Sequence, residues 1–166
     1  SYYDSVPVLF LTGQVSTFLM VGETGVRQIG FQETPIVEIC KSITKYAVTI
    51  SNPKKILFEL QKAVHFAKSG RPGPVLIDIP DDLQRTIIDT EDLVEFIPPQ
   101  LKKENAEAMD RQTKNILDLI LAAQKPILVG GWGLHLSGEE KRFLEFAEAL
   151  NIPIVLTWGG ADLVSY

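Results

Sequence analysis

With 166 residues, of which 45% are hydrophobic and 22% charged, the chain has a globular composition that fits one ordinary domain or two small ones. Its net charge of −5 does not favour nucleic acid or an anionic membrane surface as a partner, and no apolar run approaches the roughly 20 residues of a membrane helix. A single cysteine, Cys40, excludes an intrachain disulfide and is typical of a reducing compartment, so we expect a cytoplasmic protein.

The first apolar run, residues 6–13, predicts a buried strand. The loop that follows, residues 14–33, is long for a connection inside a compact domain, and such loops are more often functional than idle. Thr34 and Pro35 then suit the N-cap and the first position of a helix. Its apolar residues recur with helical spacing and predict one buried face, made of Ile36, Ile39, Cys40 and Ile43.

Residues 46–50 predict another strand, and Asn52–Pro53 repeats the cap-and-proline signal before a long helix that reaches Ser69. Gly70 is suited to close this helix in the left-handed conformation. The core stripe expected for the helix has helical spacing throughout and consists of Ile56, Leu57, Leu60, Ala63, Val64 and Ala67.

The most informative stretch is residues 70–80, in which Gly-Arg-Pro-Gly-Pro precedes an apolar run. Val75–Ile79 lacks alternation, which predicts a strand covered on both faces in a parallel sheet. Asp78 is the only polar member of the run, and a carboxylate there needs a partner. We expect a hydrogen bond to nearby backbone, with a role facing a ligand as the alternative.

Residues 81–109 are rich in acidic side chains and contain Pro98–Pro99, which predicts a linker over the surface. Its acidic cluster is interpreted as a solvated face, with a metal site as the alternative, and no metal ligand is assigned.

A second unit is predicted from Asp110, with a helix, strands over 127–129 and 152–157, and another helix between the strands. This order predicts one βαβ unit, with Ser137 and Glu140 as a capping box. The glycine turn at 130–133 is interpreted either as a plain turn or as a contact for phosphate or a dinucleotide.

Together, these segments resemble one family, the thiamine-diphosphate-dependent enzymes of the acetolactate synthase type. The resemblance lies in Thr12–Val15, in Gly30–Glu38 with Ser42–Lys45, and in the Gly-Arg-Pro-Gly-Pro-Val strand at Gly70–Pro80. Residues 126–160 are similar to the start of the family's central domain.

The resemblance implies an α/β fold with parallel sheets flanked by helices. Residues 1–80 would be the C-terminal half of the pyrimidine-binding domain, 81–109 a linker, and 110–166 the N-terminal part of a Rossmann-like central domain. The chain is expected to be a piece of a longer subunit, inactive alone. The family's activating glutamate would lie upstream of it and the diphosphate–magnesium motif downstream, so no catalytic residue is assigned here.

By the same resemblance, Ser16, Gly30, Phe31 and Gln32 line the channel to thiamine diphosphate, close to the subunit interface of a homo-oligomer, a dimer or a tetramer. Gln32 is the best candidate for a polar contact, since its amide both donates and accepts, and a loop-bracing hydrogen bond is the alternative. Some members of the family hold a flavin, FAD. The resemblance implies that Gly130, Gly131, Thr157 and Trp158 correspond to positions near that flavin.

Two residues depart from the family pattern: Ser16 replaces a usual proline, and Asp81 replaces a lysine at the channel rim. An acid at that rim is expected to repel the carboxylate of a keto acid. The implied function is a carboligase or decarboxylase that acts on 2-keto acids with thiamine diphosphate and Mg²⁺. The alternatives are a different 2-keto acid decarboxylase of the same family and a non-catalytic α/β nucleotide-binding module.

Overall fold

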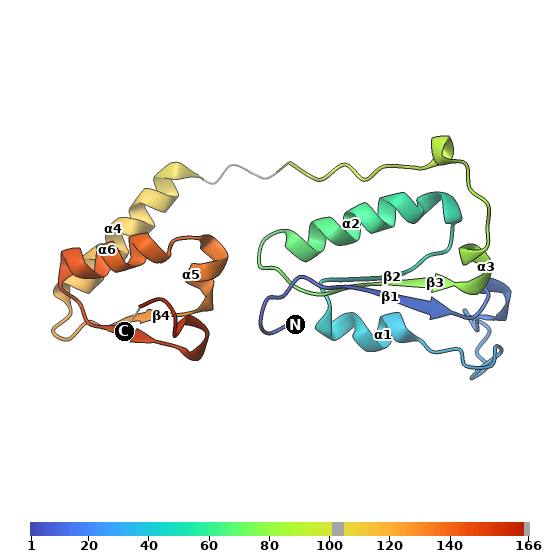
Figure 1. Ribbon diagram of the computed structural model, residues 1–166, viewed down its shortest axis with the longest axis horizontal. Coiled ribbons are helices and arrows are strands. Elements are labelled where there is room, and N and C mark those ends of the chain that lie inside the picture. Colours follow the sequence, from blue (N-terminus) through green and yellow to red (C-terminus); the bar gives the residue numbers. More distant parts are fainter. Residues whose placement is uncertain (101–104, 165–166) are drawn as a thin grey trace. The chain divides into compact units, whose positions relative to one another are not determined.

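The computed structural model describes residues 1–100 and 105–164. The chain divides into two compact units, Ser1–Leu101 and Lys102–Tyr166 (Figure 1). Both units combine parallel strands with flanking helices, which confirms the α/β prediction. Among the described residues, no helix has both the length and the apolar character needed to cross a bilayer.

The first unit is built on a parallel sheet of three strands in the order β1-β3-β2. These are β1 (Leu9–Gln14), β2 (Tyr46–Thr49) and β3 (Val75–Pro80). Val75 and Ile77 in the central strand are fully buried, as the unbroken apolar run predicts for a strand between two neighbours. The register places Thr12 of β1 and Thr49 of β2 on either side of Asp78.

Helices cover both faces of this sheet, with α2 (Ile56–Lys68) on one face and α1 (Ile36–Cys40) on the other (Figure 1). Short 3₁₀ turns accompany them: η1 (Thr17–Leu19) lies in the first long loop, η2 (Lys41–Ile43) continues α1, and η3 (Pro53–Lys55) precedes α2. Asn52 caps η3 by accepting from the Lys54 amide, as predicted. The core that α2 completes contains Ile50, Ala63, Ala67, Val75 and Ile77.

The helix predicted after Thr34 differs from the expectation. Pro35 occupies the cap position, and the Thr34 hydroxyl donates to the Gln32 carbonyl at 3.5 Å instead of capping the helix. The predicted buried face is wrong at Ile39 and Ile43, which are 58% and 50% exposed. One reason is length: α1 has only five residues, and Ile43 lies in the 3₁₀ turn η2, where the α-helical spacing no longer holds. Val64 of α2 is likewise exposed at 42%.

Residues 81–100 contain α3 (Asp81–Gln84) and η4 (Thr90–Asp92) and then contact α2. Lys54 pairs with Asp92 at 2.6 Å, the Phe96 amide donates to Gln61 Oε1 at 2.7 Å, and the Phe96 ring meets Phe58 edge-on. In the described part of the chain, no group of three or more His, Cys, Asp or Glu side chains is placed to hold a metal ion.

The second unit begins with α4 (Ala106–Ala122), which Asn105 caps inside the segment predicted as a linker. Its two strands, β4 (Leu128–Gly130) and β5 (Ile154–Leu156), are parallel, as expected for a βαβ unit. Between them lie α5 (Trp132–Ser137) and α6 (Glu140–Leu150), and η5 (Trp158–Gly160) follows β5.

The predicted capping box in this unit is wrong. Ser137 donates to the Leu134 carbonyl because it ends α5, and the left-handed Gly138 (φ 69°) separates that helix from α6. Glu140 contacts the ring of His135 at 3.1 Å instead of reaching back to a cap. The glycine turn is also shorter than predicted, since α5 already begins at Trp132.

Candidate functional site at the carboxyl edge of the first sheet

Asp78 lies at the carboxyl edge of the first sheet and is completely buried. Its Oδ1 accepts from Thr12 Oγ1 at 2.8 Å, and its Oδ2 accepts from Gln14 Nε2 and Thr49 Oγ1, both at 3.2 Å. The prediction of a backbone partner is therefore wrong: the donors are side chains of the two neighbouring strands. The two carboxyl oxygens accept from all three donors, which satisfies a buried polar group in the central strand of the sheet.

Gln14 links this buried carboxylate to the long loop. Its Nε2 also donates to the Thr34 carbonyl at 2.7 Å, and its Oε1 accepts from the Val15 amide at 2.9 Å. One side chain therefore fixes both ends of the loop between β1 and α1. The orientation of the loop that contains Gln32 depends on Asp78 through Gln14.

A cavity of about 320 Å³ opens at this edge. Its walls come from the strand ends, the loop and the start of α1, and are formed by Gln14, Met20, Val21, Gly22, Glu33, Thr34, Pro35, Ile36, Val37, Glu38, Thr49 and Asp78. Glu33 Oε1 accepts from the Val21 amide at 2.7 Å, whereas its Oε2 is buried without a hydrogen-bond partner among the described residues. In open parallel sheets, ligands bind at this edge, and a free carboxylate oxygen can accept from a ligand N–H or O–H.

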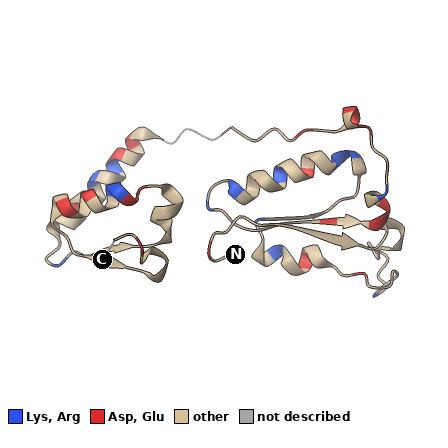
Figure 2. Ribbon diagram, in the orientation of Figure 1, with Lys and Arg blue, Asp and Glu red and all other residues tan. Residues whose placement is uncertain are grey.

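A second set of contacts ties the loop to α3. The amide and hydroxyl of Thr17 donate to Asp82 at 2.9 and 2.6 Å, and these hydrogen bonds lower the pKa of the Asp82 carboxyl below its ordinary value. The buried hydroxyl of Ser16 lies 3.4 Å from Asp81 Oδ2, which also pairs with Arg85. The two departures from the family pattern, Ser16 and Asp81, therefore contact each other. Figure 2 shows the acidic residues on α3 at this edge.

The other predicted lining residues lie on the same loop, outside the walls of the 320 Å³ cavity in the described structure. Gly30 is buried, and a Cβ there would lie 2.9 Å from the Leu19 carbonyl oxygen, so the loop closes only around a glycine. Phe31 is 86% exposed, and Gln32 adopts a left-handed backbone (φ 67°) with its side chain toward solvent. The loop thus presents an aromatic ring and an amide next to the cavity.

In the second unit, the structure brings three of the four predicted contacts together. The Thr157 amide donates to the Gly130 carbonyl at 2.8 Å, and a Cβ on Gly131 would lie 2.9 Å from Thr157 Oγ1. Trp158 follows in the chain but is 98% exposed. A Cβ on Gly130 would meet Phe143 at 3.0 Å, so packing inside the unit already requires this glycine.

Sequence reasoning missed His135, which lies between two carboxylates. Its Nδ1 is 3.1 Å from Glu140 Oε1 and its Nε2 is 2.9 Å from Asp162 Oδ1. Desolvation is the largest single influence and opposes charging, but the hydrogen bonds and charges of Asp162 and Glu140 together raise the pKa of His135 above its ordinary value. No sequence signal pointed to this contact, because His135 and Glu140 are five residues apart, which is not the spacing of neighbours on a helix, and they belong to different helices.

Known proteins show similarity to most of the chain. Acetolactate synthase 1 of Oryza sativa subsp. japonica is 37% identical to the chain over 158 residues, 95% of the chain. The large subunit of acetolactate synthase from Lactococcus lactis subsp. lactis is 35% identical over 161 residues, also 95% of the chain. The chain is thus similar to acetolactate synthases over nearly its whole length. The resemblance predicted from the strand-end, loop and Gly-Arg-Pro motifs is confirmed.

Residues 113–166 also match the family described as the thiamine pyrophosphate enzyme, central domain. The alignments with the rice and Lactococcus acetolactate synthases cover 23% and 26% of those proteins, so the chain spans about a quarter of the curated relatives it matches. The similarity to acetolactate synthases covers both compact units, not only the segment of the central-domain match.

Proposed function

We propose that this chain forms part of a thiamine-diphosphate-dependent enzyme that acts on 2-keto acids as a carboligase or decarboxylase. The observation that carries the proposal is identity of 35–37% to acetolactate synthases over 95% of the chain. The alternative of a non-catalytic nucleotide-binding module is not favoured, because that module would need only the Gly130 turn, whereas the similarity extends through both units. A different 2-keto acid decarboxylase of the same family stays compatible with this proposal.

The carboxyl edge of the first sheet fits a role beside the coenzyme. When bound, thiamine diphosphate supplies the carbanion that attacks the keto carbonyl. This chain's residues would shape the path by which the keto acid reaches the coenzyme. The Asp78–Gln14 pair would fix the loop beside that path, and the unpartnered Glu33 oxygen would accept a hydrogen bond from a ligand. The activating glutamate and the groups that hold Mg²⁺ and diphosphate are proposed to lie outside these residues.

Substrate selection is proposed to involve Ser16, Asp81 and Arg85. Asp81 alone would repel the carboxylate of a keto acid, but its ion pair with Arg85 offsets part of that charge. Both side chains are more than half exposed, so the pair is screened and leaves a mixed rim of one acid and one base. This arrangement favours 2-keto acids that carry a hydroxyl or cationic group over those with a second carboxylate.

The partner is proposed to be a second copy of the subunit, in a dimer or tetramer with the coenzyme at the interface. Phe31 and Phe18, both on the long loop, are 86% and 75% exposed, and aromatic side chains are enriched at interfaces between proteins. We propose a cytoplasmic location, in keeping with a single, partly buried cysteine.

Flavin binding is a conditional proposal for the second unit. Gly130, Gly131 and Thr157 meet at the carboxyl edge of β4 and β5, and the exposed Trp158 ring is available to stack on an isoalloxazine or adenine ring. Titration of the full-length protein with FAD tests this directly. Quenching of flavin or tryptophan fluorescence is expected on binding, and a flat titration removes flavin from the proposal.

The role of Gln32 is tested in the full-length enzyme by Gln32→Ala. If the exposed amide contacts the keto acid or the coenzyme, turnover falls by about tenfold or more while the melting temperature stays unchanged. Gln28→Ala is the matched control, because the Gln28 amide braces the same loop by donating to the Gly30 carbonyl at 2.8 Å. A Gln32→Ala enzyme with the wild-type rate assigns Gln32 to the loop alone.

A further inference from the structure

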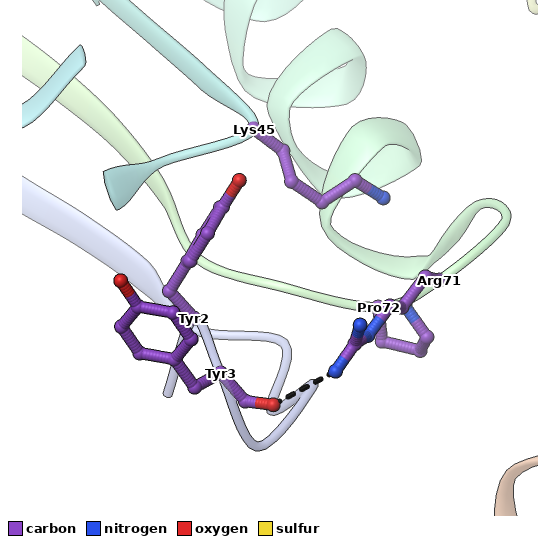
Figure 3. Close-up of a pocket in the computed structure, with 5 residues that line it drawn as sticks. All are labelled: Tyr2, Tyr3, Lys45, Arg71 and Pro72. Atoms are coloured by element: carbon purple, nitrogen blue, oxygen red, sulfur yellow. Dashed lines mark hydrogen bonds between the residues drawn. The ribbon is translucent and has the colours of Figure 1, made fainter. Parts of the chain in front are cut away.

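A second pocket lies at the amino edge of the first sheet, at the opposite end of the strands from the candidate site. Tyr2 and Tyr3 precede β1, Lys45 directly precedes β2, and Arg71 and Pro72 precede β3. Because the three strands are parallel, the segments before them meet at one edge. They enclose about 340 Å³, near the lower end of the range for small-molecule sites (Figure 3).

Hydrogen bonds fix both cations at this pocket. Arg71 donates through Nε to Ser5 Oγ at 2.7 Å and through Nη2 to the Tyr3 carbonyl at 2.9 Å, the bond drawn in Figure 3. Lys45 Nζ donates to the Ser69 carbonyl at 2.6 Å. The two positive groups are therefore held by two backbone carbonyls and one serine hydroxyl around the pocket.

The positive charge here is not neutralised within the described structure, where no carboxylate lies within 4.0 Å of Lys45 Nζ or the Arg71 guanidinium. A guanidinium has five N–H groups and an ammonium three, so the three hydrogen bonds above leave donors unused. Burial lowers the pKa of Lys45 from its ordinary value, because a partly desolvated ammonium is disfavoured, and a bound anion would offset that effect. Gly73 makes room for the lysine, since a Cβ there would lie 3.0 Å from Lys45 Cδ.

Aromatic rings form the other side of the pocket. The Tyr2 and Tyr3 rings meet edge-on, with centroids 5.5 Å apart and an interplanar angle of 86°. Figure 3 shows these rings on one side and the cationic side chains on the other. The apolar part of the lining thus stands next to the charged part, an arrangement that suits a ligand with one ring and one charged end.

We propose that this pocket binds a small oxyanion, a phosphate or carboxylate group, attached to a planar apolar ring. The oxygens contact Lys45 and Arg71, and the ring packs on Tyr2 and Tyr3. In a chain of net charge −5, two uncompensated cations at one edge of a sheet are well placed to recognise an anion. This site does not depend on the keto-acid chemistry proposed above, because it uses the opposite edge of the sheet.

Isothermal titration of the full-length protein tests the proposal with four probes: phenyl phosphate, benzoate, inorganic phosphate and phenol. We expect phenyl phosphate or benzoate to bind at least about tenfold more tightly than phosphate or phenol, because charge and ring act together. Which of the two binds identifies the oxyanion. No heat of binding from either aromatic anion up to about 10 mM overturns the proposal, as does phenol that binds as tightly as phenyl phosphate.

Three variants locate the binding. Lys45→Gln is expected to weaken the binding of the aromatic anion by about tenfold or more. Lys68 is an exposed lysine at the end of α2, and Lys68→Gln is expected to leave the affinity unchanged. Tyr3→Ser removes an 82% exposed ring without disturbing the core, and is expected to reduce the affinity for phenyl phosphate to that for inorganic phosphate. Unchanged affinity in both Lys45→Gln and Tyr3→Ser overturns the assignment to this pocket.

Discussion

Replacing Asp78 by alanine is expected to destabilise the first sheet strongly, because three half-buried donors lose their common acceptor. A hydrogen bond to a charged group contributes about 1.5–3 kcal/mol, and the desolvation of the carboxylate offsets part of the sum. We therefore expect the free energy of opening of the sheet to fall by about 2–4 kcal/mol. For a unit of this size, that corresponds to a melting temperature lower by roughly 10–25 °C.

Hydrogen–deuterium exchange of the full-length protein reports the free energy of opening separately for each unit, and peptides covering β1 and β3 report it for the first sheet. Asp78→Asn keeps the side-chain volume but turns an N–H toward existing donors, so we expect an effect of about 1–3 kcal/mol. Asp118→Ala, on an exposed position of α4, is the control and should leave these peptides unchanged. Wild-type exchange of β1 and β3 in Asp78→Ala would refute the reasoning.

Three further perturbations test other contacts. Gly30→Ala is expected to destabilise the first unit by about 1–3 kcal/mol in urea unfolding, because the added Cβ meets the Leu19 carbonyl. Gly133→Ala is the control and should not destabilise the protein, because Gly133 lies in a helix with open space around the position of the new Cβ. His135 has a raised pKa, so its charged form stabilises the second unit below about pH 6.5, and this stabilisation is lost as pH rises through the raised value. His135→Gln should abolish that pH dependence in thermal melts. Asp82→Asn should speed proteolysis of the loop at 15–35. Because the pKa of Asp82 is lowered, its carboxylate should protect this loop from proteolysis fully above about pH 3.9, and the protection should disappear as the pH falls through the lowered pKa.

Each of these has a contrary outcome. Equal unfolding midpoints for the two glycine variants would show that the loop adjusts around a methyl group at Gly30. A His135→Gln protein with the wild-type pH profile of melting would place the titrating group elsewhere. Proteolysis at the wild-type rate in Asp82→Asn would mean that other contacts hold the loop.

The strands could be predicted from sequence because burial on both faces selects an unbroken apolar run, as in Val75–Ile79. The buried face of α1 could not, since whether Ile39 and Ile43 are covered depends on how far the sheet extends beside them. The donors to Asp78 lie up to 66 residues away in the chain, so no local pattern names them. The Ser-x-x-Glu pattern likewise suggested a capping box at Ser137 and Glu140, but α5 ends at Ser137, and the Glu140 side chain contacts His135 instead.

At the candidate site too, the sequence predicted the region but not the contacts within it. The long loop after β1 was recognisable by its length and glycines, but its attachment to α3 depends on contacts across 65 residues, such as Thr17 with Asp82 and Ser16 with Asp81. Glu33 was part of a recognised motif, yet its buried, unpartnered oxygen became apparent only from the folded loop. The motif therefore located the region, and the tertiary structure located the groups that can act.

The most direct test of the proposed function is the consumption of 2-keto acids by the full-length protein, measured with and without thiamine diphosphate and Mg²⁺. We expect consumption of pyruvate or a larger 2-keto acid that requires the coenzyme, and none by the isolated 166-residue chain under the same conditions. A folded full-length protein that consumes no member of a 2-keto acid panel, or whose activity does not depend on thiamine diphosphate, would contradict the proposal.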